Sequence, residues 1–152
     1  MGGSGFGAGL INPLEGIVTS TFGMRKNPVT GDLEFHNGID IAADIGTDIR
    51  AVCGATVAET GENSFNGKYL VLRHEGAEVI YAHLSGILVK EGDAVKSGQV
   101  IAQSGDTGVA TGPHLHYGLR ANGDYIDPYP FVSLGLTEEA LHEVAQREDG
   151  SY

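Results

Sequence analysis

Two histidines separated by a single leucine, His114 and His116, are the residues of this 152-residue chain whose types and spacing first indicate chemistry. Because side chains in a strand alternate between faces, both imidazoles would point the same way and Leu115 would point into a core. Gly112 and Pro113 indicate a turn that fixes where this strand begins. Imidazole nitrogen is a favoured zinc ligand, so the pair is typical of one side of a metal site.

Two motifs upstream carry the other residue types that a metal site needs. His36 and Asp40 stand four positions apart in the run His-Asn-Gly-Ile-Asp, which offers an imidazole and a carboxylate. His83 lies in the run Tyr-Ala-His-Leu at the end of an apolar stretch. Any one of these histidines alone is more often a hydrogen-bonded structural residue, so the chemical interpretation depends on their joint occurrence. His74 and His142 lack such a context and are expected to be surface or structural residues.

Together the three motifs resemble those of the lysostaphin-type (LytM-like) zinc metalloendopeptidases, which cut peptide bonds in bacterial cell walls. The resemblance rests on His-x-x-x-Asp, Tyr-Ala-His-Leu and Gly-Pro-His-Leu-His in the family's order, and it covers residues 13–128. It implies one Zn²⁺ per chain. The metal ligands that it implies are His36, Asp40 and His116, and the catalytic residues that it implies are the two non-ligand histidines His83 and His114.

The chemistry implied by this resemblance is hydrolysis of peptide bonds in peptidoglycan cross-bridges or stem peptides. Three protein ligands leave one open position for water, whose pKa a bound zinc lowers to about 7. The chain has no His-Glu-x-x-His motif, so the resemblance gives the general acid and base roles to imidazoles, whose pKa lies near neutrality. The sequence leaves open which bond is cut and which histidine is the base.

Two other classes of function fit parts of the sequence. One is a catalytically inactive wall-binding or regulatory module of the same fold, although all five key residues of the family pattern are present here. The other is a lipoyl or biotinyl carrier domain, whose Gly-Asp turn resembles residues 89–101. A carrier needs a modifiable lysine at a hairpin tip between hydrophobic neighbours, and Lys96 beside Ser97 fits that requirement poorly.

Charge and cysteine content exclude further classes. The net charge of −11 argues against a nucleic-acid binder and against electrostatic attraction to an anionic membrane or wall polymer. Cys53 is the single cysteine, so the chain has no intrachain disulfide. Its apolar neighbours favour a small buried side chain over a catalytic thiol.

Glycine is frequent, with 24 residues, which indicates many tight turns between short strands. With the resemblance, this predicts a mostly β fold, an antiparallel barrel-sandwich hybrid of short strands with one short C-terminal helix. Residues 24–32 are predicted to be a loop, and Asn122 with Gly123 a hairpin turn. Within the strand predicted at residues 78–84, alternation puts His83 on the same face as Tyr81.

The predicted domain organisation has three parts. Residues 1–12 are a flexible Gly-rich linker, residues 13–130 are the peptidase domain, and residues 131–152 are a helical extension. The helix in this extension is predicted to begin at an N-cap, Thr137. An apolar stripe of Leu141, Val144 and Ala145 would face the protein, and the helix is expected to add stability without affecting zinc binding.

The expected site of action is the bacterial cell wall. The sequence shows neither a signal peptide nor an apolar segment of the ~20 residues that span a membrane. Together with the Gly-rich N-terminus, this favours a domain of a larger protein, or a protein exported by other means, and suggests a virion-associated phage tail or lysin module. The expected partner is a peptidoglycan peptide, and the oligomeric state is left open.

Overall fold

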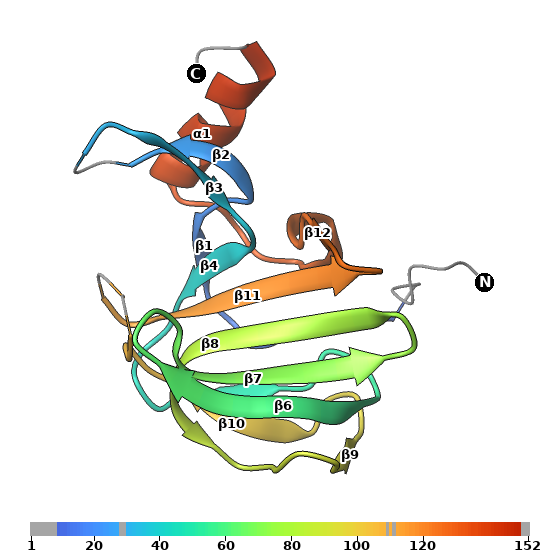
Figure 1. Cartoon of the computed structure of the whole chain (residues 1–152). Helices are drawn as coiled ribbons and strands as arrows, with labels where there is room; N and C mark the ends of the chain where they lie inside the picture. Colours follow the sequence, from blue (N-terminus) through green and yellow to red (C-terminus); the bar gives the residue numbers. More distant parts are fainter. Residues whose placement is uncertain (1–8, 28–29, 109, 111, 150–152) are drawn as a thin grey trace.

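The computed structural model describes residues 9–27, 30–108, 110 and 112–149. These residues form twelve strands, a short 3₁₀ helix and one α-helix near the C-terminus (Figure 1). Every strand pair among them is antiparallel. The prediction of a mostly β, antiparallel fold with one C-terminal helix is therefore confirmed.

The strands and helices have the following bounds in chain order: β1 Ile17–Ser20, β2 Gly23–Lys26, β3 Leu33–His36, β4 Ile39–Ala42, β5 Asp48–Arg50, β6 Ala55–Asn63, β7 Gly67–His74, β8 Ala77–Ile87, β9 Ala94–Val95, β10 Val100–Ser104, β11 His114–Ala121, β12 Asp124–Ile126, η1 Tyr129–Phe131 and α1 Glu138–Asp149.

Ten strands form one sheet, in which strands from distant parts of the chain become neighbours. The order is β1-β4-β11-β8-β7-β6-β9, with β12 paired to β11, and with β10 paired to both β8 and β5. The described strands do not close into a barrel, because this path ends at β1 and β9. β2 and β3 form a separate hairpin, which stands away from the sheet beside α1 (Figure 1).

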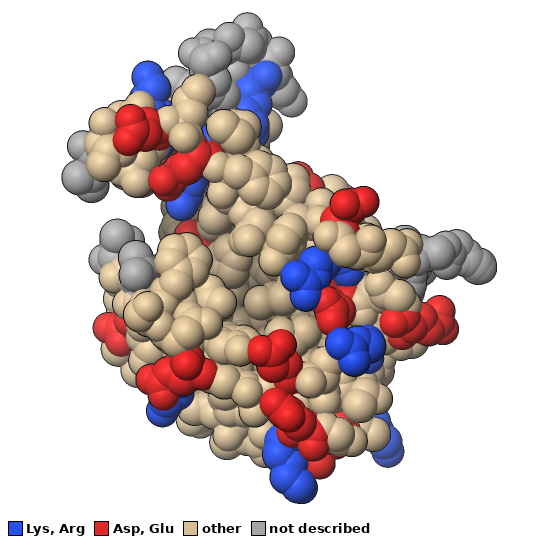
Figure 2. Space-filling model, in the orientation of Figure 1, with Lys and Arg blue, Asp and Glu red and all other residues tan. Residues whose placement is uncertain are grey.

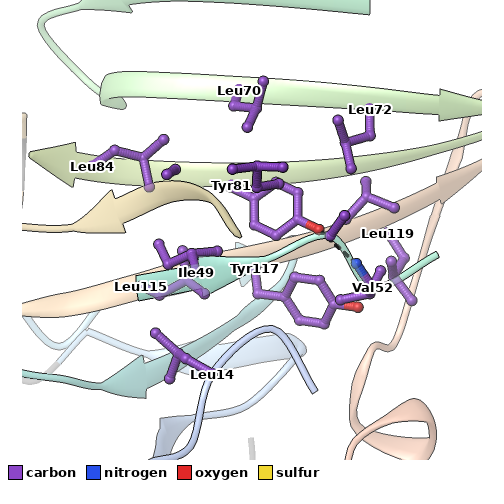
Figure 3. Close-up of a cluster of buried hydrophobic side chains, with 14 of the residues drawn as sticks. Leu14, Ile49, Val52, Leu70, Leu72, Tyr81, Leu84, Leu115, Tyr117 and Leu119 are labelled. Carbon is purple, nitrogen blue, oxygen red and sulfur yellow. Dashed lines mark hydrogen bonds between the residues drawn. The ribbon is translucent and has the colours of Figure 1, made fainter. Parts of the chain in front are cut away.

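The core lies where the large sheet folds over itself. Side chains of β7, β8 and β11 meet those of β5 and β10, and the buried cluster includes Ile49, Leu72, Ile101 and Leu115 (Figure 3). Burying such side chains contributes about 1.5–3 kcal/mol each. This core holds the three strands β4, β11 and β8 rigidly side by side.

The register of β4, β11 and β8 puts polar residues on one face of the sheet. His116 is the partner of Asp40 on β4 and of Ala82 on β8, and Leu115 is the partner of Ile41. Leu115 and Ile41 are fully buried. The predicted alternation around the two histidines of β11 is therefore confirmed, with the leucine in the core.

The predicted alternation in β8 is wrong at His83. The register between β7 and β8 shifts between the pairs Lys68↔Leu84 and Leu70↔Tyr81, so β8 has one extra residue there. His83 takes the left-handed conformation, with φ 63°. Such a bulge resets the alternation, so Tyr81 and Leu84 both reach the core and His83 leaves the face that Tyr81 occupies.

Two predictions about turns have different outcomes. Met24 to Lys26 were expected in a loop but belong to β2, because they pair with β3 in a hairpin whose turn begins at Asn27. Asn122 and Gly123 both have positive φ, 53° and 87°, between β11 and β12. The predicted two-residue hairpin turn is confirmed there.

The C-terminal helix begins as predicted but turns a different face inward. Thr137 Oγ1 accepts a hydrogen bond from the Ala140 amide, which confirms the N-cap. Leu141, expected to face the protein, is 58% exposed, whereas Ala140 is fully buried. The inward face also carries Glu143 and Arg147, which both bond to Thr21 between β1 and β2. Among the described residues, no helix has the length and hydrophobicity needed to cross a membrane.

Parts of the predicted terminal segments can be followed in the structure. Residues 1–8 of the predicted linker, residues 150–152 of the predicted extension and Thr111 lie outside the described residues. Leu10 packs against the core, and the Ile11 amide donates to the Val52 carbonyl. The division into linker, peptidase domain and extension stays a prediction.

Two buried tyrosines give a matched test of the core. The Tyr81 hydroxyl accepts from the Val52 amide at 3.2 Å and donates to the Arg50 carbonyl (Figure 3). The buried Tyr117 hydroxyl has no hydrogen-bond partner within the described part of the chain. We expect Tyr81→Phe to lower the free energy of unfolding by about 1–3 kcal/mol, because the Val52 amide loses its acceptor.

Tyr117→Phe is the control and should leave stability unchanged or raise it, since it removes an unsatisfied buried hydroxyl. Urea unfolding followed by circular dichroism measures both variants. Equal losses would contradict this account of the core.

Candidate metal centre

The fold gathers all five predicted site residues on one face of the molecule. His36 ends β3, Asp40 lies in β4, His83 lies in the bulge of β8, and His114 and His116 lie in β11. The His83 and His114 ring centroids are 4.9 Å apart, and those of His36 and His116 are 5.1 Å apart. By contrast, His142 is exposed on α1 and His74 lies at the far end of β7, where it faces Glu75 at 3.9 Å.

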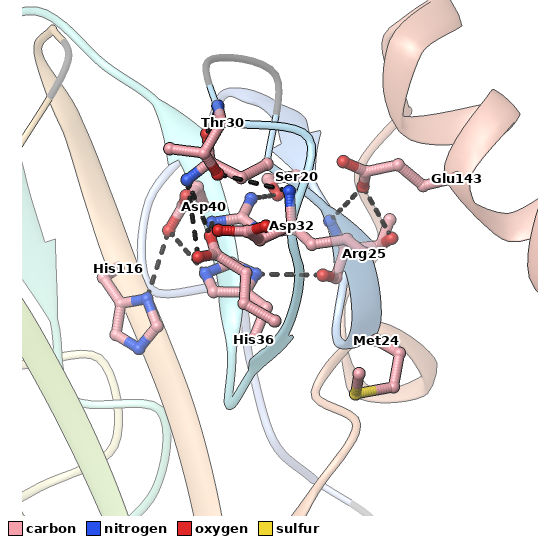
Figure 4. Close-up of polar contacts among 12 residues, drawn as sticks. Ser20, Met24, Arg25, Thr30, Asp32, His36, Asp40, His116 and Glu143 are labelled. Atoms are coloured by element: carbon pink, nitrogen blue, oxygen red, sulfur yellow. Dashed lines mark hydrogen bonds and ion pairs between the residues drawn. The ribbon is translucent and has the colours of Figure 1, made fainter. Parts of the chain in front are cut away.

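Three imidazoles converge on one carboxylate oxygen, Asp40 Oδ1. The distances to it are 3.1 Å from His116 Nδ1, 3.3 Å from His36 Nε2 and 3.7 Å from His114 Nε2. The Asp40 carboxyl lies between the His36 and His116 rings (Figure 4). All these side chains are largely buried, so few water molecules can reach the polar atoms at the centre.

The opposite nitrogen of each ring is held by an oxygen that only accepts hydrogen bonds. Backbone carbonyls face the Nδ1 atoms of His36, His83 and His114 at 2.9, 2.7 and 2.8 Å. The Asn37 side-chain oxygen faces His116 Nε2 at 3.1 Å. Because these oxygens accept hydrogen bonds, the outer nitrogen of each ring can donate an N–H to them. With the proton there, the inner nitrogen presents a lone pair, which is the tautomer that a metal ion requires.

The carbonyls that hold these three Nδ1 atoms belong to residues outside the motifs or at their edge. They are those of Thr21 for His36, Thr107 for His83 and Gly112 for His114. Such outer partners fix the tautomer and the orientation of a histidine that binds a metal.

This donor set fits a divalent metal ion. Lone pairs on His36 and His116 and a carboxylate oxygen of Asp40 would repel one another without a proton or cation between them. The donor atoms of these three residues all lie within 4.8 Å of one another. Two imidazoles and one carboxylate, with a further position open, are typical of a catalytic zinc site. His83 and His114 lie beside this group and outside it.

Electrostatics keep two of the candidate ligands, Asp40 and His116, in the form that binds a metal. Burial opposes ionisation of Asp40, but the hydrogen bonds and charges of His116 and His36 outweigh it, so the pKa of its carboxyl lies well below the usual range. Burial lowers the pKa of His116, and the charges of His36 and His114 lower it further, although Asp40 opposes both effects. At neutral pH, therefore, the carboxylate is ionised and the imidazole of His116 is neutral.

His83 reaches the site through its strained backbone position. A non-glycine residue at φ 63° is uncommon and costs on the order of 1 kcal/mol or more, so it requires support from its surroundings. The His83 amide donates to the Asn66 carbonyl at 2.8 Å, and the ring donates to Thr107. Burial lowers the pKa of His83, and neighbouring histidine charges lower it further.

Gly38 permits the close approach of β3 and β4 to β11. A Cβ at this position would lie 2.5 Å from the Tyr117 carbonyl oxygen and 2.9 Å from the His116 ring. No other residue type fits there without moving that ring. The glycine therefore matters for the spacing between His116 and the His36–Asp40 motif.

Three residues that support the site, Asn37, Thr21 and Thr107, were not singled out by the sequence analysis. Asn37 lies inside the His-x-x-x-Asp motif, so its proximity could have suggested a role. Thr21 and Thr107 contribute backbone carbonyls, which every residue possesses, and they lie far from the motifs they support. Only the tertiary contacts identify them.

The surface around the site is hollowed where the β2–β3 hairpin stands out from the rest of the molecule (Figure 2). Lys and Arg side chains on this face lie among Asp and Glu side chains and form no continuous basic patch in the view shown. A neutral or weakly charged peptide suits such a surface better than a polyanion does.

Comparison with known proteins agrees with the motifs. Residues 34–128 match peptidase family M23. A Vibrio cholerae protein named peptidoglycan DD-endopeptidase ShyC is 43% identical over 113 residues, which cover 73% of this chain and 26% of that protein. The chain spans about a quarter of the length of the curated relatives it matches.

Two solved structures share the fold. One is a zinc-containing peptidase from Vibrio cholerae, with a TM-score of 0.68 and 36% identity over 78% of this chain and 39% of that one. The other is the catalytic domain of lysostaphin from Staphylococcus simulans, with a TM-score of 0.68 and 32% identity over 76% of this chain and 91% of that one.

Gly38 and Gly118 give a matched pair of substitutions beside the His116 ring. We expect Gly38→Ala to displace that ring and to weaken Zn²⁺ binding at least about tenfold. Gly118→Ala is the control, because its new Cβ would meet its nearest atom, the Asn37 carbonyl oxygen, at 3.4 Å. Competition with a chromogenic chelator measures both affinities, and equal losses in the two variants would contradict the close-approach argument.

Proposed function

The chain belongs to peptidase family M23, and we propose that it is a zinc-dependent endopeptidase that hydrolyses peptide bonds in peptidoglycan cross-bridges or stem peptides. The predicted resemblance to lysostaphin-type metallopeptidases is confirmed by the family match and by the named relatives. The observation that carries the proposal is the convergence of His36 Nε2 and His116 Nδ1 on Asp40 Oδ1, beside two further histidines.

In this proposal His36, Asp40 and His116 hold one Zn²⁺. Bound there, zinc supplies a Lewis acid and acidifies a water molecule at the open position. The ionised Asp40 offsets part of the metal charge, and Thr21 and Asn37 hold the two imidazoles through their outer nitrogens. The zinc-containing Vibrio structure of the same fold supports zinc as the ion.

His83 and His114 act as the general base and general acid. The proton on each Nδ1 is engaged by the Thr107 or Gly112 carbonyl, which leaves Nε2 as the atom that gains or releases a proton. One neutral Nε2 accepts the proton of the attacking water. A protonated Nε2 of the other ring donates a hydrogen bond to the developing oxyanion, or a proton to the leaving amine.

The proposed substrate class follows from the named relatives and from the surface of the site. Three relatives are named as peptidoglycan DD-endopeptidases and three as DD-carboxypeptidase/endopeptidases. The surface beside the β2–β3 hairpin is hollowed (Figure 2). Action at the cell wall, outside the cytoplasm, is part of this proposal, and the association with a virion stays a prediction.

An inactive wall-binding module of the same fold is the alternative. It is disfavoured by the complete set of five residues, since a binding module has no need of buried histidines whose inner nitrogens face a carboxylate. Digestion of purified sacculi of different cross-bridge chemistry, with mass spectrometry of the new termini, tests the proposal. New amino termini at one peptide bond support it, and intact sacculi with a zinc-loaded protein would favour the binding module.

The roles of ligand and proton carrier can be separated within one strand. We expect His116→Ala to lose both zinc and activity, because two protein ligands remain. His114→Ala and His83→Ala should keep about one zinc per chain and lose roughly 10²–10⁴-fold in turnover. Elemental analysis after gel filtration, alongside hydrolysis rates, measures both properties.

His114 and His116 make the decisive comparison, because they are two positions apart on the same strand face. A zinc-free His114→Ala together with a zinc-loaded His116→Ala would show that the two roles are reversed. Full zinc content and full activity in both variants would overturn the proposed enzyme.

A further inference from the structure

The helix α1 lies outside the residues that match the family, yet it reaches the candidate metal centre through a short chain of contacts. The match covers residues 34–128, and α1 spans Glu138–Asp149. Figure 1 shows α1 beside the β2–β3 hairpin, and α1 also contacts β1, the edge strand of the large sheet. The segment before α1 forms two hydrogen bonds with β1. The Thr137 amide donates to the Val18 carbonyl, and the Val18 amide donates to the Gly135 carbonyl.

Two charged side chains of α1 bind the chain at the corner between β1 and β2, which consists of Thr21 and Phe22. Glu143 Oε1 accepts hydrogen bonds from the Thr21 amide and from the Thr21 hydroxyl, both at 2.9 Å (Figure 4). Arg147 donates to the Met24 carbonyl at 3.0 Å and to the Thr21 hydroxyl. The amide, hydroxyl hydrogen and hydroxyl oxygen of Thr21, a residue that is only 3% exposed, are thus all bound by α1.

The remaining polar group of Thr21 binds the candidate ligand. Its carbonyl accepts a hydrogen bond from His36 Nδ1 at 2.9 Å, and His36 Nε2 faces Asp40 Oδ1 at 3.3 Å. The path from α1 to the centre therefore consists of one carboxylate, one threonine and one imidazole. Each link is a hydrogen bond or an ion pair between largely buried groups, where such contacts are strong.

The corner at Thr21 needs this support because it lies outside both strands. β1 ends at Ser20 and β2 begins at Gly23, so the large sheet does not hold the residues between them. Thr21 donates its amide hydrogen to a side chain, whereas a residue within a sheet would donate to a neighbouring strand. Without Glu143, the orientation of the Thr21 carbonyl would be free to change, and the His36 ring would lose its fixed acceptor.

We propose that Glu143 and Arg147 are positioning residues for His36, so that α1 contributes to metal affinity and not to stability alone. The inference rests on the proposed role of His36 as a metal ligand. It replaces the expectation from sequence that the helix leaves zinc binding unaffected. It also explains why Glu143 and Arg147, rather than Leu141, lie on the inward face of α1.

The first test is the Zn²⁺ affinity of the folded full-length protein, measured by chelator competition. We expect Glu143→Ala to weaken binding about 10–100-fold, the range found for lost outer partners of metal ligands. Glu139→Ala is the matched control, an exposed glutamate of the same helix, and should change affinity less than about twofold. Glu143→Gln keeps an oxygen that can accept from Thr21, so it should restore most of the affinity.

A purely structural role predicts a different pattern. Glu143→Ala would then lower the unfolding midpoint of the metal-free protein but would bind Zn²⁺ with wild-type affinity wherever it is folded. The visible absorption of the Co²⁺-loaded protein separates the two cases, because it reports the ligand geometry around the ion. An unchanged spectrum and unchanged affinity in Glu143→Ala would overturn the proposal.

A second readout requires no metal and separates this inference from the proposed enzyme. Nitrogen-15 spectra of the imidazole rings in the metal-free protein report which nitrogen of each ring is protonated and hydrogen-bonded. Glu143→Ala should shift the His36 ring signals and leave those of His83, which is held by Thr107, unchanged.

If the wild-type protein bound no zinc, the proposed function would fail, but a selective His36 shift would still support the positioning role. If zinc bound normally and the His36 signals did not move, the positioning role alone would fail.

Discussion

The organisation of this protein depends on one constraint, the convergence of imidazole nitrogens on the buried oxygen Asp40 Oδ1. Without a proton or a cation between them, lone pairs on these nitrogens and the negative charge would repel one another at 3.1–3.7 Å, and burial makes that repulsion larger than it would be in water. Such an arrangement persists only if the rest of the fold holds each group in place. A divalent cation at the centre converts the same repulsion into binding energy, which is why the geometry points to a metal.

The fold meets this constraint in two layers. The register of β4, β11 and β8 sets the positions of Asp40 and His116, and a rigid core beneath them prevents slippage. Outside the centre, carbonyl oxygens and one amide oxygen bind the far nitrogen of each ring. The strand register fixes the backbone positions of the site residues, and the surrounding oxygens fix which ring nitrogen faces inward. Both layers are needed, because a correctly placed imidazole in the wrong tautomer presents a proton where the metal needs a lone pair.

The second layer is built from segments that are remote in the chain. Thr107 supports His83 from the loop before β11, and Thr21 supports His36 from the corner after β1. That corner is itself held by Glu143 and Arg147 of α1. The family match ends before this helix, yet its inward face carries Glu143 and Arg147 beside the buried Ala140, and both charged side chains bond to Thr21. The supporting groups are thus spread more widely along the chain than the histidines they orient.

The sequence alone determined the residues with reactive side chains and much of the strand pattern. Period-two alternation predicted that His114 and His116 share a face with Leu115 in the core, and motif order predicted the five site residues that the fold brings together. Local patterns failed at His83, because a bulge adds one residue and resets the alternation, and at Leu141, because the contacts of Glu143 and Arg147 orient the helix. The tertiary structure alone decided which oxygen faces the outer nitrogen of each ring. Backbone carbonyls such as that of Thr21 are the same in every residue, so only their position in space makes them part of a site.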